Sequence, residues 1–285
     1  MNTCDLIELE LVVANIVDIA PKSDISSMEH PIFSLSKQKD LDTFRYETPK
    51  KDAWIEVVPS THGRPTIFDK DLLLYCIGQI IEAKNRGRTV SRRIQITAYE
   101  YFISTGRGYS GGEYKRLHNA LGRLRGTTIR TNITTKGTSN NNNTLRGDVF
   151  GLIDDARIVE SDGKTIGLEI TLSDRLFNAI NENHVLTYSR DYFKLSSPNE
   201  RRMYELCRKH CGQQDMWQID FENLYLKFGS KSKINEFRRM FKKMVASQNI
   251  PDYFIKYSKD KKSELVSVVR DASGEVKAYA KSIKS

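Results

Sequence analysis

The stretch of sequence that decides the fold is residues 220–270, DFENLYLKFGSKSKINEFRRMFKKMVASQNIPDYFIKYSKDKKSELVSVVR. Residues 220–228 predict a helix that ends at a glycine, and residues 230–248 predict a second helix that stops before a proline. Two runs rich in β-branched and aromatic residues, 253–258 and 265–270, flank a polar turn and predict a β-hairpin. Helix, turn, helix and hairpin in this order predict a winged-helix domain.

The same order of elements occurs earlier in the chain. Residues 96–104 predict a short helix, a glycine-rich turn follows, and residues 113–125 predict a second helix. Strand-like runs come next, and two of them flank the turn at residues 161–163. A core helix precedes each group, at residues 69–87 and 197–212. We therefore predict an α+β, mainly helical fold of two tandem winged-helix domains, each a helical core with a β-hairpin wing.

This repeat divides the chain into four parts. An N-terminal segment of unassigned structure covers residues 1–51, and the first winged-helix domain, residues 52–186, is a candidate for dimer and DNA contacts. The second winged-helix domain, residues 187–272, is predicted to supply the main DNA contacts, and residues 273–285 form a basic tail. The length of 285 residues suits two cores, because one domain usually takes roughly 100–200 residues.

The composition is that of a folded, basic protein. Hydrophobic residues make up 39% of the chain and charged residues 28%, and no apolar run is long enough to predict a membrane span. The formal net charge of +9 and the pI of about 9.2 predict attraction to a polyanion such as nucleic acid. Four scattered cysteines favour a reducing cytoplasm. Acidic residues interrupt the apolar run at residues 6–19, unlike a signal peptide, and that run fits a strand as well as a helix.

The helix at residues 230–248 separates an apolar face from a basic one. Its apolar residues share one face at roughly 100° per residue: Ile234, Phe237, Phe241, Met244 and Val245. Between residues 231 and 248 there are six Lys or Arg and one Glu, which is too one-sided for the alternative, an ordinary solvated face. In a major groove, Arg or Lys pairs with guanine and Asn with adenine. We predict that bases are read by Asn235, Arg239 and Lys242, and that phosphates are contacted by Arg238 and Lys243. Lys231, at the start of this helix, completes the predicted DNA-binding set.

The helix at residues 113–125 shows the same pattern with less contrast. Lys115, Asn119 and Arg123 recur at every fourth position, opposite an apolar stripe of one tyrosine and three leucines. Small and neutral residues dilute this basic face. We predict DNA contacts from these three residues, and a face turned to water or to a partner chain remains the alternative.

No pattern in the sequence predicts catalysis, a cofactor or a metal. The glycines at residues 106–111 follow a helix instead of a strand, so an interhelical turn is favoured over a dinucleotide site. Residues 163–165 lack the earlier glycine that a phosphate loop needs. Cys207, His210 and Cys211 share a helix, but no second ligand pair follows them. We predict a protein that is not an enzyme.

Several runs resemble the replication initiator protein A family of bacterial plasmids. They are MEHPIFSL at residues 28–35, IFDKD at 67–71, LSD at 172–174, SRDYF at 189–193 and ERRMYEL at 200–206. The resemblance extends from about residue 28 to residue 270. The segment before it, including residues 6–27, is expected to be dispensable for DNA binding.

The resemblance implies a protein that binds repeated double-stranded DNA sites, or iterons, at a plasmid origin. Such initiators help to open the neighbouring duplex and bring in the host replication initiator and the replicative helicase, and they make or break no bond. Related initiators often switch between dimers and monomers, so a homodimer formed through the first domain remains an alternative to a monomer. The alternative function is a winged-helix transcriptional repressor, which would use the same helices and charge but usually adds a ligand-sensing domain.

Overall fold

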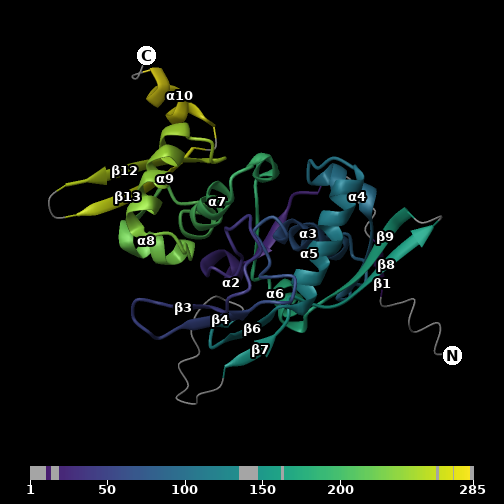
Figure 1. Ribbon diagram of the computed structural model, residues 1–285. Helices are drawn as coiled ribbons and strands as arrows, with labels where there is room; N and C mark the ends of the chain where they lie inside the picture. The colour runs from purple at the N-terminus through teal and green to yellow at the C-terminus, as the bar shows by residue number, and fades with distance from the viewer. Residues whose placement is uncertain are drawn as a thin grey trace.

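Two groups of elements repeat the order helix, strand, helix, helix, strand, strand in the computed structural model (Figure 1). The structure describes residues 11–13, 19–134, 147–161, 164–260, 263–271 and 273–282. The first unit consists of α3 (Lys70–Asn85), β5 (Arg93–Thr97), α4 (Ala98–Ser104), α5 (Gly111–Gly126), β8 (Ile153–Ser161) and β9 (Lys164–Leu172). The second unit consists of α7 (Pro198–His210), β11 (Met216–Asp220), α8 (Phe221–Phe228), α9 (Ile234–Ser247), β12 (Tyr253–Lys259) and β13 (Glu264–Arg270). The antiparallel strand orders β5-β9-β8 and β11-β13-β12 correspond to one another.

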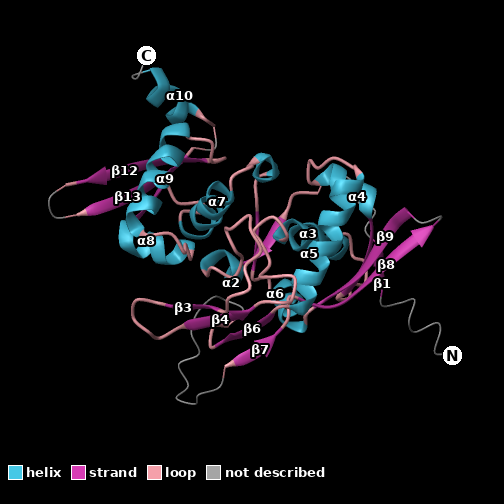
Figure 2. Ribbon diagram, in the orientation of Figure 1, coloured by secondary structure: helices cyan, strands magenta, loops and turns pink. Residues whose placement is uncertain are grey.

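The first unit carries additional strands. A second antiparallel sheet, in the order β3-β4-β6-β7, lies at the lower edge of the view in Figure 2. Its strands are β3 (Phe44–Glu47), β4 (Trp54–Val58), β6 (Thr128–Thr131) and β7 (Asp148–Phe150). The short strand β1 (Leu11–Val13) runs parallel to β5, and α6 (Asp174–Asn181) follows β9.

The segment around residue 25 connects the two units. β2 (Lys22–Asp24) pairs with β10 (Val185–Thr187), and α2 (Ile25–Glu29) packs against α7. The carboxylate of Asp24 caps α2 by accepting a hydrogen bond from the amide of Ser27 at 2.8 Å. Residues 22–29 are therefore part of the folded body.

Local chemistry sets the ends of the helix before α9. The carboxylate of Asp220 accepts hydrogen bonds from the amides of Glu222 and Asn223 at 2.9 and 3.2 Å. Gly229 ends α8 with a φ of 63°, and a Cβ atom there would lie 2.4 Å from Pro31. Only glycine meets both conditions, so the turn between α8 and α9 is held where the sequence predicts it.

Buried apolar side chains form two clusters, one in each unit. In the second cluster, Phe221 and Phe228 of α8 pack against Phe237 and Phe241 of α9, with ring centroids 4.9–6.4 Å apart. Aromatic pairs at such distances attract one another and bury large areas, so these contacts stabilise the packing of α9 against α8.

Buried ion pairs join α3 to α7 across the two units. Lys70 donates to Glu205 at 2.6 Å, and both side chains are 1% exposed. Arg201 donates to Asp71 at 2.5 Å, and within α7 Arg202 donates to Glu205 at 3.1 Å, which holds the carboxylate that Lys70 binds. Lys70–Glu205 and Arg201–Asp71 therefore connect the two units through α3 and α7.

The structure confirms the α+β prediction and both predicted helix pairs, while some boundaries and strands differ. The helix expected from residue 96 begins at Ala98, because Ile96 and Thr97 belong to β5. β5 and β11 were not predicted, and the strand predicted directly after α5 pairs with β4 instead of β9. The polar loop around residues 140–143 lies outside the described residues, as does most of the run at residues 6–19. The predicted N-terminal segment contains β1, β2, α2 and β3, and the predicted C-terminal tail contains α10 (Glu275–Ser282).

Candidate nucleic-acid interface

α9 turns its apolar face to the core and its polar face to solvent. Phe237, Phe241 and Met244 are buried. The exposed side chains of the opposite face include four predicted DNA-binding residues, Asn235, Arg239, Lys242 and Lys243. Arg239 and Lys243 line a shallow groove of about 440 Å³ that the start of α7 closes on the other side. The predicted separation of the two faces is confirmed, and this face is open to a ligand.

Arg238, a predicted phosphate contact, instead fastens the β12–β13 hairpin to α9. Its guanidinium donates to the carboxylate of Glu264 at 2.5 and 2.9 Å and to Oδ1 of Asn235 at 2.6 Å. The hydroxyl of Tyr257 also hydrogen-bonds to Glu264. The hydrogen bond from Arg238 lowers the pKa of Glu264 to about 2 against the opposing effect of burial. Arg238 therefore positions both the hairpin and Asn235.

Lys231 ties the segment before α9 to the loop at residues 40–42. Its Nζ donates to Asp40 at 2.7 Å and to Asp42 at 3.1 Å. Burial opposes ionisation of Asp40, but the hydrogen bond from Lys231 and the charge of Arg64 lower the pKa of its carboxyl. This residue, too, has an intramolecular partner where the sequence predicted a DNA contact.

The three predicted residues of α5 differ in their surroundings. Lys115 is exposed, and Asn119 is half-buried beside a groove. Arg123 donates from Nε and Nη2 to the two carboxylate oxygens of Asp69, each at 2.7 Å. Asp69 precedes α3 but does not cap it, because its carboxylate binds Arg123 and the amide of Thr66. Arg123 therefore packs α5 onto the start of α3.

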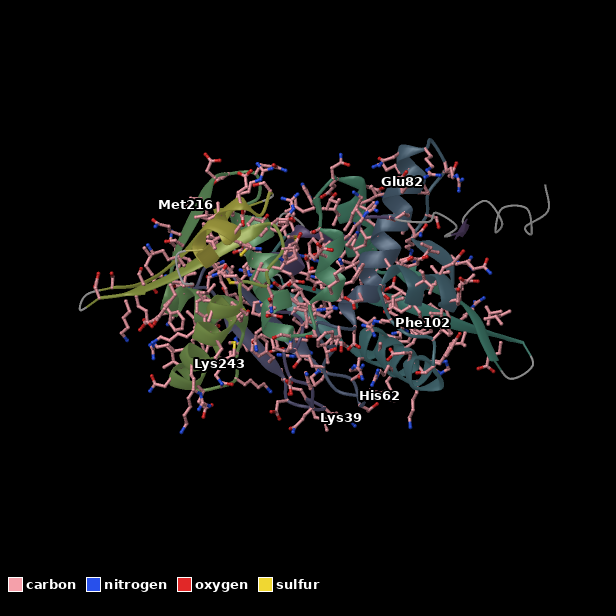
Figure 3. The ribbon with its side chains drawn as sticks, turned by 90° about the horizontal axis from the view of Figure 1, so that it is seen from above. Lys39, His62, Glu82, Phe102, Met216 and Lys243 are labelled. Carbon is pink, nitrogen blue, oxygen red and sulfur yellow. The ribbon has the colours of Figure 1, made fainter. Side chains whose placement is uncertain are left out.

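A strongly basic groove of about 930 Å³ runs beside α5. Its walls come from the outer face of α5, from residues 36–39, from the loop that carries His62 and from the linker before α7. Eight of its lining residues are Lys or Arg and two are acidic. Carboxylates outside the lining, Asp40, Asp71 and Asp191, offset part of this charge, and the remaining excess is positive, so the groove attracts anions. Lys39 and His62 lie on the same side of the molecule as Lys243 of α9, away from Met216 and Glu82 (Figure 3). The groove and the polar face of α9 thus share one side of the protein.

Helix periodicity could not reveal the groove residues that come from loops. Lys37 and Lys39 are exposed, and the only local signal for them is two lysines among four polar residues. His62 rests against Gly122 of α5, where a Cβ atom would lie 3.0 Å from its ring. The glycine that dilutes the basic face of α5 is therefore the residue that lets this loop approach.

The residues weighed for other chemistry have structural surroundings. Cys207 and Cys211 are buried in the second cluster, and the ring of His210 stacks on Trp217 with centroids 4.7 Å apart. In the part of the chain that the structure describes, no group of three or more His, Cys, Asp or Glu side chains is arranged to hold a metal ion. None of the described helices has the length and apolar character needed to cross a membrane.

Comparisons with known proteins agree with this architecture. The model of the family "Replication initiator protein A" matches residues 22–255, a span that begins before the expected residue 28 and includes β2 and α2. A relative from Wigglesworthia glossinidia brevipalpis named "Putative replication protein" is 41% identical over 254 residues, which cover 87% of this chain and 90% of the relative.

Two crystal structures of domains 2 and 3 of RctB have a similar fold. One, of selenomethionine derivatives, has a TM-score of 0.63 at 12% identity and covers 87% of this chain and 99% of the solved chain. The other has a TM-score of 0.54 at 13% identity and covers 88% and 99%. At these identities the likeness concerns the fold alone.

Proposed function

The chain belongs to the replication initiator protein A family, and we propose that it acts by binding double-stranded DNA at a plasmid origin. The observation that carries this proposal is the exposed basic face of α9, which lies on the same side of the molecule as the groove beside α5 (Figure 3). A face of this kind, on the second helix of a helix-turn-helix, suits the major groove of DNA.

We infer that each unit is a winged helix. The pairs α4–α5 and α8–α9 would be the helix-turn-helix motifs, and the hairpins β8–β9 and β12–β13 would be the wings. The support is the shared order of elements and the matching strand order in the two sheets. The second helix of each pair also turns polar residues outward.

The surroundings of each side chain divide the proposed roles. Arg239 is exposed and forms no ion pair with any described residue, so it is the proposed reader of a guanine. Lys242 is close to Arg239 on the same helix. Asn235 can pair its side-chain amide with adenine if the hydrogen bond that Arg238 donates to its Oδ1 breaks. Lys243 is the proposed phosphate contact, and Lys115 and Asn119 form a second contact area on α5.

Later steps are proposed from family membership. Binding at repeated sites would help to open the neighbouring duplex and bring in the host initiator and the replicative helicase in the bacterial cytoplasm, without any enzymatic step. Whether the protein acts as a monomer or as a homodimer is an outcome of the sizing experiment below.

Fluorescence anisotropy with duplexes from the plasmid that carries the gene tests the proposal. We expect origin repeats to bind at least roughly 10³-fold more tightly than a scrambled duplex, as specific DNA binders do. Sizing of the complex on one and two repeats gives the number of chains bound. Equal affinity for repeat and scrambled DNA would contradict specific binding.

A repressor would pass that binding test, so replication must be measured as well. A plasmid that keeps the origin but lacks this gene should be maintained only when the protein is supplied from elsewhere. Maintenance of that plasmid without the protein would favour the repressor.

A further inference from the structure

Arg64 lies in the wall of the groove beside α5 with hydrogen-bond donors that are not satisfied. The residue is 3% exposed, and its guanidinium stacks over Phe44 at 4.2 Å. Among the described residues, its Nε and Nη1 atoms have no hydrogen-bond partner. The carboxylate of Asp40 is 3.7 Å from Nε, which is beyond hydrogen-bond range. Oδ2 of Asp40 also has no hydrogen-bond partner, so Asp40 offsets the charge of Arg64 without satisfying its donors, and Nη1 in particular lacks an acceptor.

The rim of the groove adds positive charge without compensating carboxylates. Lys37 and Lys39 are exposed and form no ion pair within the part of the chain that the structure describes. The acidic lining residues Asp69 and Glu113 are already paired with arginines. Exposed lysine ammonium groups and a buried guanidinium in one groove suit a phosphate group, which carries charge and several acceptor oxygens.

The loop that presents Arg64 is pre-organised. Ser60 accepts a hydrogen bond from the amide of His62 at 3.1 Å and donates to the carbonyl of Gly63 at 3.0 Å. Gly63 has a φ of 97°, and the amide of Arg64 donates to the carbonyl of Asp40 at 2.7 Å. Because Asp40 also binds Lys231 just before α9, the loop is linked to both units.

We propose that the Arg64 groove, formed by Lys37, Lys39, His62 and Arg64, is a phosphate-binding site that neither recognition helix supplies. In the DNA complex its ligand is a phosphate of the DNA backbone, between the contacts of α5 and α9. That the phosphate belongs to DNA rests on the proposed function. A free phosphate-bearing solute would use the same donors.

The DNA arm of the test uses the full chain and origin duplex. The paired substitution Lys37→Ala and Lys39→Ala, and separately Arg64→Gln, should weaken repeat and scrambled DNA by the same factor. Each should reduce the magnitude of the slope of log K against log salt by about 1. Lys84→Ala, in the last turn of α3 and outside the residues that line the groove, is the control and should leave the slope unchanged.

The second arm asks for free phosphate in the absence of DNA. Inorganic phosphate is titrated against chloride at equal ionic strength while the melting temperature is followed. If the groove takes free phosphate, the wild-type protein is stabilised and the Lys37/Lys39 variant is not. The result for Arg64→Gln is interpreted only if the melting curve in chloride shows that this variant is folded. If it is not folded, the result for the exposed Lys37/Lys39 variant tests the site.

The combined results separate the sources and the two proposals. A changed salt slope assigns the groove to the DNA backbone, and phosphate stabilisation with an unchanged slope assigns it to a free ligand. If neither measurement distinguishes the lysine pair from Lys84→Ala, the phosphate site is refuted even though α9 still binds DNA. If wild-type protein shows no preference for origin DNA, the proposed function fails while the phosphate arm still decides the groove.

Discussion

Neighbouring arginines on α9 have opposite tasks. Arg238 is held by the carboxylate of Glu264, whereas Arg239 is exposed on the polar face. One helical position moves a side chain by about 100°, which is enough to change its partner from protein to solvent. The distinction leads to two predictions at the scale of single residues.

Arg239→Ala should reduce affinity for the origin repeat by about 1–3 kcal/mol and relax selectivity at one base pair, because the lost contact is to a base edge. Lys243→Ala should weaken repeat and scrambled DNA alike and reduce the salt slope by about 0.9. Anisotropy on both duplexes over a range of salt concentrations measures these effects. If Arg239→Ala weakened both duplexes equally, Arg239 would be a phosphate contact instead.

Arg123→Ala should cost stability instead of DNA affinity. The substitution leaves the buried carboxylate of Asp69 without its two bonds from Arg123, which should lower the free energy of unfolding by roughly 1.5–3 kcal/mol. Urea denaturation measures the free energy of unfolding, and anisotropy at a temperature where the variant is folded measures the affinity for DNA. A large loss of affinity in a fully stable variant would return Arg123 to the DNA-contacting set.

At the scale of elements, contacts within the protein hold the interface in place. The β12–β13 hairpin is fastened to α9 by Glu264, and the segment around β2 is clamped between the units. Each attachment can be tested by itself.

Glu264→Gln should destabilise the second unit in a pH-dependent way. The pKa of Glu264 is lowered from 4.5 to about 2, so its ionised form stabilises the fold above pH 4.5 and this contribution disappears as the pH falls toward 2. The wild-type protein should therefore be more stable than the variant at pH 6, and the difference should shrink at lower pH. Urea titrations across this range measure it. A constant difference would show that Glu264 acts through packing alone.

Deletion of residues 1–27 should destabilise the protein and thereby weaken origin binding, whereas the sequence predicts that this segment is dispensable for DNA binding. The deletion removes β2 and the cap of α2, including the buried residues Ser23 and Asp24. Loss of a helix cap alone costs roughly 0.5–2 kcal/mol, so the deletion should cost more. Asp24→Ala in the full chain isolates the contribution of the cap. Unchanged unfolding and unchanged origin affinity would restore the earlier expectation.

At the scale of the whole molecule, the buried pairs between α3 and α7 set how the two units face DNA. Lys70 and Arg202 both depend on Glu205, which is 1% exposed. Glu205→Ala should lower the free energy of unfolding by about 3–5 kcal/mol, because it leaves the buried Lys70 without its carboxylate partner and removes one of the acceptors of Arg202. Glu222→Ala, at an exposed position of α8, is the control. A loss below about 1 kcal/mol would mean that the Lys70–Glu205 pair contributes little to holding the two units together.

The sequence by itself determined the two helix pairs, the C-terminal hairpin, the polarity of α5 and α9, the excess of positive charge and the family. These features depend on caps, turns and periodicities that act over a few residues, and the structure places the helix faces as the pattern predicts. Only the tertiary structure decided which basic residues are free. Arg123, Lys231 and Arg238 bind carboxylates that lie 54, 191 and 26 residues away in the chain. The Arg64 groove likewise combines residues from loops that are far apart in the sequence. An ion pair needs only two side chains brought within a few ångströms by packing, so no local pattern can name its partner.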